Sequence, residues 1–327
     1  MKSLTEKTVV LALFSIISMS CLASNQAKLF GKAHLSFGTV SEDDGITDTS
    51  STAVDSHASR IGVKGAVDTD SDTTVIYRFV WQIDMTDNAA SSDDHIKSRE
   101  QYVGLKGEWG QLRIGRDDSP YKKAGKKNVE QFSDSYADYN NIIDKNQDTR
   151  NDNSVGYWLE FGPAKFGLQY AAGDDEVSAE NAGQSYNVAY DMKTGSFGFA
   201  VAYQAIEKSE TNDETGTKLI LGYKQGATQL GVIGETVEDD INLDDTNMLI
   251  SIKHNISNKN AVKFVYGTKD QGNTDDATMT AFAFDHNLGN KVSIYALWAD
   301  GADGGLSAAS KLAGDSSAIA LGVVANF

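Results

Sequence analysis

The sequence predicts an all-β fold, a transmembrane antiparallel β-barrel of 16 strands with short periplasmic turns and long outer loops. Three observations support this prediction. Segments that alternate apolar and polar residues recur along the chain, and the connections between them alternate between short and long. Beyond the N-terminal region no apolar run reaches the length of about 18 residues that a membrane-spanning helix needs. Each alternating segment is near the ~9–11 residues of a tilted transmembrane strand.

The first 23 residues have the pattern of a signal peptide. Lys2 and Lys7 lie in a polar start, Val9 to Ile17 form a short apolar run, and Cys21 and Ala23 place small residues before a cut after Ala23. A run of nine residues is too short to cross a bilayer, which favours cleavage over a membrane anchor. The expected organisation is a signal peptide at 1–23 and a barrel domain at 24–327.

Composition excludes several classes of function. Cys21 is the only cysteine, so a chain cut after Ala23 has no disulfide, thiolate nucleophile or cysteine metal ligand. The signal peptide takes two lysines and one glutamate with it, which leaves 27 basic and 45 acidic residues and a net charge of −18. Nucleic acid is an improbable partner for such a chain, because phosphate binding needs a basic surface.

The predicted strands follow one another along the whole barrel domain. They are Ala27 to Gly38, Asp55 to Val67, Thr73 to Met85, Lys97 to Gly107, Gly110 to Arg116, Asn153 to Phe161, Lys165 to Gly173, Gly183 to Met192, Ser196 to Ile206, Gly216 to Gln225, Ala227 to Val237, Asp245 to His254, Asn260 to Lys269, Asp276 to Asn287, Asn290 to Ala299 and Asp315 to Phe327.

Within a strand one face is apolar. In the third strand Val75, Tyr77 and Phe79 share a face, while Arg78 and Gln82 lie on the other. We interpret the apolar face as facing lipid. The final strand alternates in the same way up to Phe327, and we expect it to pair with the first strand and close the barrel.

Connection lengths add a second, independent indication. Turns of only a few residues alternate with long loops, which is typical of an outer-membrane barrel and is not required of a soluble β-sandwich. The longest predicted loops are Thr39 to Val54, Asp117 to Asp152 and Asp300 to Gly314.

Motifs of enzymes are absent from the sequence. It has no phosphate-binding loop, nucleophile elbow or paired zinc histidines, and its five histidines are scattered singly. Asp144 to Asp152 imitates the start of a calcium loop but has Thr149 where glycine is needed and Val155 where glutamate is needed. We therefore predict no catalytic residues, no cofactor and no metal site. Acidic outer loops could bridge to lipopolysaccharide through divalent ions, although the composition favours simple solubility of the loops.

An ordered set of short motifs resembles the Gram-negative general diffusion porins, a family of trimeric outer-membrane proteins. The motifs cover essentially the whole chain after the signal peptide and end with the terminal Phe327. They are Leu29 to Ala33, Ser59 to Gly65, Arg99 to Gly107, Gln111 to Arg116 and Arg150 to Tyr157.

The resemblance implies a homotrimer of 16-stranded barrels in which the third outer loop, here Asp117 to Asp152, folds into the lumen and constricts it. It also implies acids on this loop that face arginines on the barrel wall. By position the pore constriction would comprise Arg60, Arg78, Arg99, Arg113, Arg150, Glu130, Asp134 and Asp138. The Pro-Glu-Phe-Gly element common in this loop of the family is missing, and four lysines, at 122, 123, 126 and 127, stand early in the loop.

Strand parity tests the wall arginines one by one. Arg60, Arg78, Arg113 and Arg150 alternate with apolar neighbours and are expected to point inward. Arg99 shares parity with Val103 and Leu105, so either a β-bulge separates them or those two apolar residues face inward.

The predicted function is a water-filled channel in the outer membrane of a Gram-negative bacterium, through which small hydrophilic solutes and ions diffuse passively. Its expected partners are membrane lipid, lipopolysaccharide and two further copies of the chain. Three alternatives remain open. The first is a substrate-specific channel for saccharides or other solutes, with an aromatic path formed by Tyr121, Phe132, Tyr136 and Tyr139. The second is an outer-membrane hydrolase with a Ser–His pair, and the third is an exported soluble adhesin.

Overall fold

The computed structural model describes residues 27–86, 95–144, 147–173, 185–209, 212–239, 244–270, 275–306 and 314–327. The predicted signal peptide, 1–23, lies outside these ranges. Among the described residues no helix is both long enough and apolar enough to cross a membrane.

In the described ranges the chain forms seventeen strands and three short helical turns. The strands are β1 (Lys28–Asp43), β2 (Asp48–Ser56), β3 (Arg60–Asp68), β4 (Thr74–Ile83), β5 (Ile96–Gly107), β6 (Gly110–Asp118), β7 (Arg150–Phe161), β8 (Ala164–Ala171), β9 (Ser185–Thr194), β10 (Phe197–Ser209), β11 (Asn212–Gln225), β12 (Thr228–Asp239), β13 (Asp245–Asn255), β14 (Asn260–Lys269), β15 (Ala277–Asn287), β16 (Val292–Ala302) and β17 (Asp315–Asn326). The helical turns are α2 (Pro120–Lys123), α3 (Lys126–Val129) and η2 (Tyr139–Asn141).

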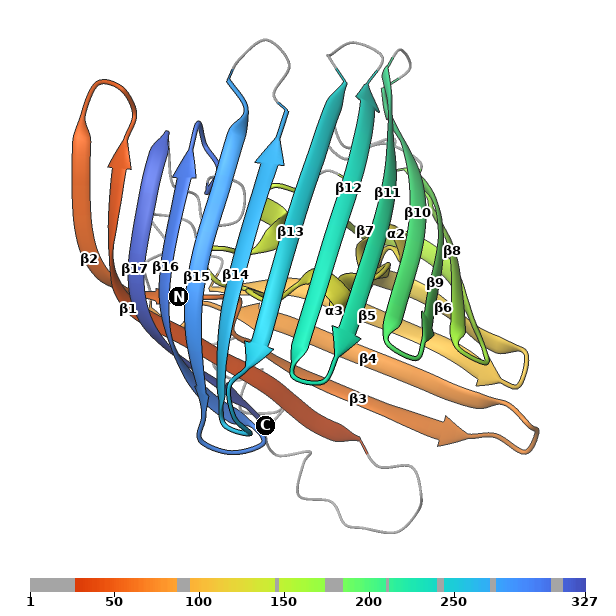
Figure 1. The fold of residues 1–327 in the computed structure, drawn as a ribbon. Helices are drawn as coiled ribbons and strands as arrows, with labels where there is room; N and C mark the ends of the chain where they lie inside the picture. The colour runs from red at the N-terminus through yellow and green to blue at the C-terminus, as the bar shows by residue number, and fades with distance from the viewer. Residues whose placement is uncertain are drawn as a thin grey trace, which may run out of the picture.

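All strands belong to one antiparallel sheet that closes on itself (Figure 1). β2 and β3 both pair with β1, β2 along its second half and β3 along its first, so they act as one interrupted strand. The interruption spans residues 57–59 and contains Ala58, whose φ of 46° is unusual for a residue with a Cβ. The seventeen strands therefore build the predicted barrel of 16 strands, which confirms the fold class.

The seam of the barrel joins its first and last strands. β1 and β17 pair from Lys32↔Asn326 to Glu42↔Ser316. Gly31 and Phe327 extend the ladder, since each backbone N–H donates to the other's carbonyl oxygen at 3.1 Å. A Cβ at position 31 would lie 2.3 Å from Phe327 Cζ, so only glycine admits this ring. The expected pairing of the final strand with the first is confirmed.

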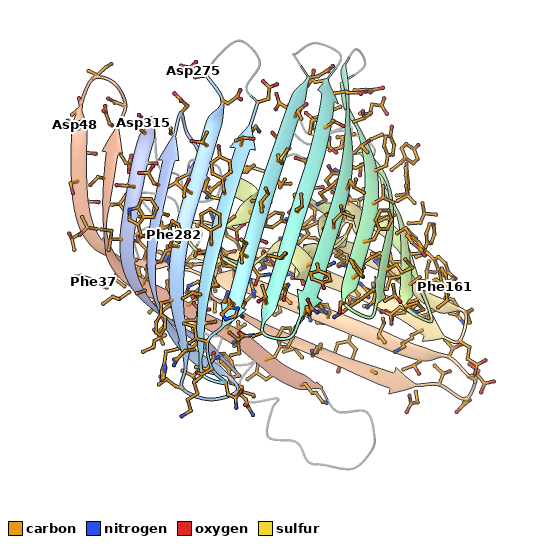
Figure 2. All side chains as sticks on the ribbon, viewed as in Figure 1. Phe37, Asp48, Phe161, Asp275, Phe282 and Asp315 are labelled. Atoms are coloured by element: carbon orange, nitrogen blue, oxygen red, sulfur yellow. The ribbon has the colours of Figure 1, made fainter. Side chains whose placement is uncertain are left out.

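The two faces of the sheet differ as the alternation predicts. On β11 Leu219 and Leu221 are nearly half exposed, whereas Ile220 between them is fully buried. Exposed aromatic and aliphatic side chains cover the outer surface of the barrel, and Asp48, Asp275 and Asp315 lie at one rim (Figure 2). In a closed barrel the exposed apolar face is the outside, which fits a lipid environment.

Three predicted loops are shorter than expected. The hairpin of β1 and β2 covers most of Thr39 to Val54, where hydroxyl pairs such as Thr39–Thr52 (2.8 Å) bridge the strands. β2 is exposed and polar over most of its length, so no alternation of apolar with polar residues revealed it. The predicted loop Asp300 to Gly314 starts later than expected, because β16 continues to Ala302. Residues 307–313 of this loop lie outside the described residues.

The third of these loops was predicted as 117–152, which is also too long. Asp117 and Asp118 belong to β6 and residues 150–152 to β7, because the two strands keep pairing beyond an irregularity at Gly115. The connection itself therefore spans 119–149.

Candidate functional site

The connection between β6 and β7, residues 119–149, is hereafter the inner segment. Its first turn is α2, where Pro120 occupies the first helical position and the Ser119 hydroxyl accepts a hydrogen bond from the Lys122 amide at 3.0 Å. Its apolar side chains, among them Ile142 and Ile143, are fully buried.

The inner segment packs on the buried face of β10 to β13. At Gly125 an added Cβ would lie 2.8 Å from Ile220, and at Gly198 and Gly222 it would collide with Asn128. The wall glycines thus make room for α3. This face is the one opposite the exposed apolar surface, and α2 and α3 are drawn within the ring of strands (Figure 1).

Asp134 is the one predicted acid that contacts a predicted wall arginine among the described residues. Its Oδ2 lies 3.2 Å from Arg60 Nη2 and 2.7 Å from Lys32 Nζ. Burial by itself would raise the pKa of the Asp134 carboxyl, but the charges of Lys32 and Arg60 hold that pKa below its ordinary value. The carboxylate is therefore charged at neutral pH.

Arg99 reaches the same region because of a β-bulge. The β4–β5 register runs from Phe79↔Gln101 to Trp81↔Ser98, so one extra residue of β5 lies in between. Val103 and Leu105 remain on the exposed face, as their exposures of 49% and 41% show. Of the two explanations for the parity of Arg99, the bulge is confirmed.

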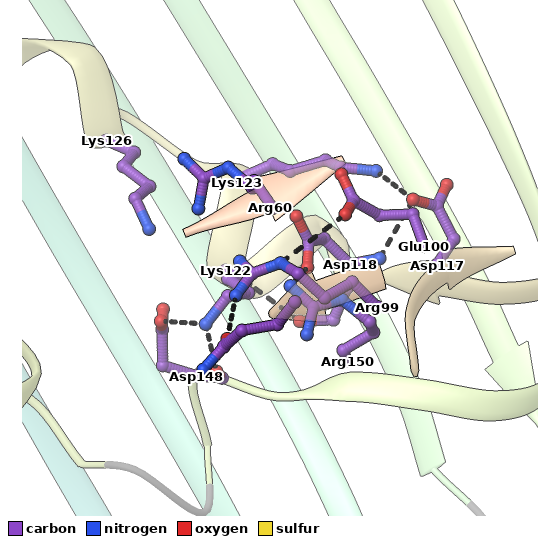
Figure 3. A network of polar contacts seen from close by, with 12 residues as sticks. Arg60, Arg99, Glu100, Asp117, Asp118, Lys122, Lys123, Lys126, Asp148 and Arg150 are labelled. Carbon is purple, nitrogen blue, oxygen red and sulfur yellow. Dashed lines mark hydrogen bonds and ion pairs between the residues drawn. The ribbon is translucent and has the colours of Figure 1, made fainter. Parts of the chain in front are cut away.

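Arg99 is only weakly compensated. Its Nη1 donates to Gln82 Oε1 at 2.8 Å, its ion pair with Glu100 is long, with Oε2 3.9 Å from Nε, and its charge also acts on the Asp134 carboxylate. Arg60, Arg99 and Arg150 lie together beside α2 (Figure 3).

Arg78 and Arg113 pair with acids of the barrel wall, Arg78 with one on the neighbouring strand and Arg113 with one on its own strand. Arg78 Nη2 lies 3.1 Å from Glu100 Oε1. Arg113 Nη1 lies 2.8 Å from Asp117 Oδ2, and its guanidinium carbon sits 4.4 Å from the centre of the Trp158 ring.

Arg150 is the first residue of β7 and pairs with Asp118, with Nη2 2.7 Å from Oδ1. An irregularity between Asn151 and Ser154, with φ of 48° at Asn153, interrupts the alternation from which its direction was predicted. Arg150 nevertheless lies in the predicted cluster (Figure 3).

Glu130 and Asp138 have partners within the inner segment. Glu130 Oε1 lies 3.1 Å from Lys126 Nζ, and Asp138 accepts hydrogen bonds from the backbone N–H groups of Asp134 at 2.6 Å and Asn140 at 2.9 Å. Burial raises the pKa of both carboxyls, that of Glu130 to about 7. Asp138 thus caps η2, and no contact of these two acids with a wall arginine is recorded in the described ranges.

Sequence reasoning missed several members of the charged cluster. Lys123 Nζ reaches Asp117 Oδ1 at 2.7 Å and Lys122 Nζ reaches Asp148 Oδ2 at the same distance. Lys32 could have been found from its parity with the buried His34 and Ser36. The missed residues are Lys32, Glu100, Asp117, Asp118, Lys122, Lys123, Asp148 and Lys218.

The aromatic residues of the inner segment do not line an open path. Tyr121, Phe132, Tyr136 and Tyr139 are each at most 5% exposed and pack in the hydrophobic core between the segment and the wall. A stacked aromatic route for a specific solute is therefore not formed by these four rings. Among the described residues no group of three histidine, cysteine or carboxylate side chains could hold a metal ion.

Comparison with known proteins agrees with the fold. The family model described as Gram-negative porin matches residues 8–301. The major outer membrane protein P.IB of Neisseria meningitidis serogroup A is 27% identical over 231 residues, which cover 67% of each chain.

Two solved structures have the same architecture. The anion-selective porin from Comamonas acidovorans has a TM-score of 0.77 at 18% identity, with 93% of this chain and 100% of that chain covered. OmpF of Salmonella typhi, in complex with daunomycin, has a TM-score of 0.74 at 14% identity, with 93% and 98% covered. The family match, which spans most of the sequence, confirms the predicted family, function and location: the chain belongs to the Gram-negative porins, channels of the outer membrane.

Proposed function

We propose that the inner segment narrows the channel and that the charged cluster at its base makes the opening prefer anions. Small hydrophilic solutes would pass by diffusion, without a cofactor and without chemistry. The observation that carries the proposal is the excess of cations in the ion-pair cluster shared by the inner segment and the wall.

The ion pairs of the inner segment and of the wall arginines predicted for the pore contain eleven basic and eight acidic side chains in the described ranges. The bases are Lys32, Arg60, Arg78, Arg99, Arg113, Lys122, Lys123, Lys126, Arg150, Lys218 and Lys269, and the acids are Glu100, Asp117, Asp118, Glu130, Asp134, Asp144, Asp148 and Asp245. Several acids are shared between two bases, as Asp134 is between Lys32 and Arg60. A ring of basic side chains in a pore raises the local concentration of anions and lowers that of cations.

The narrowing rests on the packing of the inner segment. It contacts the buried face of β10 to β13 through α3 and reaches β1 and β3 through Asp134. A segment fixed at both sides of a barrel crosses its interior and reduces the free cross-section. The eight residues predicted for the constriction thus have different roles here: Arg60, Arg78, Arg99, Arg113, Arg150 and Asp134 would form the charged opening, and Glu130 and Asp138 would shape the segment.

The remaining expectations belong to the same proposal. A homotrimer is proposed from the family, and lipid and lipopolysaccharide are the proposed surroundings of the exposed apolar face. The absence of catalytic activity follows from the role of a passive channel. A substrate-specific channel is less favoured because the four candidate aromatic rings are buried.

Planar-bilayer recording of the purified oligomer tests the proposal. In a tenfold KCl gradient we expect a reversal potential of the sign that shows chloride to be more permeant than potassium. We also expect a current that rises linearly with solute concentration. A reversal potential on the cation side would refute the anion preference. A variant with residues 121–147 replaced by a short Gly-Ser linker should conduct more and admit larger polyethylene glycols; unchanged values would refute the narrowing.

A further inference from the structure

One carboxylate inside the barrel collects donors from three parts of the fold. Asp148 lies at the end of the inner segment, and its side chain is 0% exposed. Its Oδ2 accepts from Lys122 Nζ at 2.7 Å, from the Tyr139 hydroxyl at 2.6 Å and from Asn140 Nδ2 at 2.9 Å. Its Oδ1 lies 3.2 Å from Lys218 Nζ. These partners come from α2, η2 and the wall strand β11.

We propose that Asp148 and Lys218 are the positioning residues that fix the inner segment on the wall and thereby set the calibre of the channel. This inference rests on the proposed narrowing role of the segment. It adds which contact determines how wide the opening is.

The geometry ties the start and the return of the segment together. Lys122 also donates to the Asp148 backbone oxygen at 2.7 Å, so entry and exit are joined by two bonds. With both ends of the segment held at β11, the turn that carries Asp134 can reach only a limited part of the opposite wall. The contacts of Asp134 with Lys32 and Arg60 lie within that reach.

Without the Asp148 carboxylate, the buried ammonium of Lys218 would destabilise the folded protein. Its side chain is 2% exposed, and its ammonium lies 4.3 Å from the centre of the Tyr121 ring. In a water-filled barrel an inward lysine would be hydrated, but here the inner segment covers it. A buried ammonium without a carboxylate is strongly unfavourable. The inner segment and the wall strand therefore stabilise each other's charge only when the segment is docked.

The surroundings of Asp148 keep it ionised. Burial alone would raise the pKa of its carboxyl, but the ammonium groups of Lys122 and Lys218 hold that pKa below its ordinary value. A neighbouring contact strengthens the same docking, because the Tyr121 hydroxyl donates to Glu235 Oε1 at 2.7 Å while the Asp144 amide donates to Oε2 of the same carboxylate, also at 2.7 Å.

Three variants of the full-length protein test the proposal: Lys218→Met, Asp148→Asn and the double substitution. Asp148→Asn leaves Lys218 buried without its carboxylate and should shift the equilibrium from docked to detached segment by roughly a hundredfold or more, whereas Lys218→Met leaves Asp148 paired with Lys122 and should shift it less. We expect a higher single-channel conductance and passage of larger polyethylene glycols in both variants, with the larger change in Asp148→Asn. The double variant should lie closer to the wild type than Asp148→Asn, because it leaves no buried Lys218 ammonium without a carboxylate.

The matched control is Lys165→Met. Lys165 and Glu160 form an ion pair of 2.7 Å at the β7–β8 turn, but their side chains are 59% and 63% exposed, so its loss should leave conductance unchanged. Wild-type conductance and polymer cut-off in Lys218→Met and Asp148→Asn would overturn the proposal, as would a double variant that differs more from the wild type than Asp148→Asn does.

The linker replacement of 121–147 separates this failure from failure of the narrowing role. If that replacement widens the channel while the single variants do not, only the anchoring role fails. If the replacement also leaves the channel unchanged, the narrowing role fails with it. If a single variant does not fold, the double variant is compared with the wild type instead. A polyethylene glycol cut-off far from the wild-type value would then count against charge pairing as the basis of the docking.

Discussion

Replacement of Arg99 by glutamine is the most direct test of the anion preference. Arg99 has the longest ion pair of the cluster, since the Glu100 carboxylate is 3.9 Å away and also pairs with Arg78 at 3.1 Å. Glutamine keeps a hydrogen-bonding side chain opposite Gln82 and removes the charge. The β-bulge that turns position 99 inward depends on the backbone register, so we expect it to persist.

The size of the effect follows from Coulomb's law. A unit charge acts on a monovalent ion about 4 Å away in water with about 1 kcal/mol, which corresponds to a roughly fivefold change in local ion population. At 0.1 M salt the Debye length is about 10 Å, so most of the charge acts on ions within the opening. Because the same charge attracts anions and repels cations, removal of Arg99 should lower the ratio of anion to cation permeability by up to roughly 25-fold.

Reversal potentials in a tenfold KCl gradient measure this ratio. We expect the Arg99→Gln channel to shift toward the cation side and Lys165→Gln, which removes an exposed charge at a turn, to match the wild type. Because screening weakens the effect, the shift should shrink at 1 M salt. Equal reversal potentials for Arg99→Gln and the wild type at 0.1 M would refute the electrostatic account of the opening.

Two further predictions concern titration and assembly. Burial raises the pKa of Glu130 from 4.5 to about 7, so anion preference should fall from pH 6 to pH 8 as this carboxyl ionises, and Glu130→Gln should remove that dependence. The folding stability linked to this shift is fully present below pH 4.5 and is lost as pH rises through about 7, which melting curves of both proteins would reveal. Deletion of Phe327 removes its backbone bonds to Gly31 and should slow barrel formation, measured as the heat-resistant fraction on gels, without altering the conductance of assembled channels; normal assembly would contradict this.

The strands were predictable because a barrel wall imposes one period on the sequence. Leu219, Ile220 and Leu221 are all apolar, yet their neighbours still placed β11 from Gly216 to its end at Gln225, since its outer face must meet lipid. The hairpin of β1 and β2 was missed for the opposite reason. β2 is exposed and polar over most of its length, so the alternation of apolar with polar residues that marks other strands does not arise.

The candidate site was only partly predictable. Parity gives the side of a strand on which a charge lies, and it identified Arg60, Arg78 and Arg113. It does not give partners across the barrel, because the contact of Asp134 with Lys32 joins residues 102 positions apart. The bulge before Arg99 could be inferred as one of two options, but choosing between them required the register of β4 and β5.

The proposed anion preference shows why the charge of the whole chain is a poor guide to selectivity. The whole chain has a charge of −17, yet the cluster near the inner segment has more bases than acids. Many of the acids lie elsewhere, as Asp48, Asp275 and Asp315 do at the rim (Figure 2). Ionic screening limits the reach of such charges to about 8 Å at physiological salt, so an ion inside the opening responds mainly to the side chains around it. A chain that is acidic overall can therefore form an opening that prefers anions, and neutralising rim acids should change reversal potentials less than neutralising Arg99.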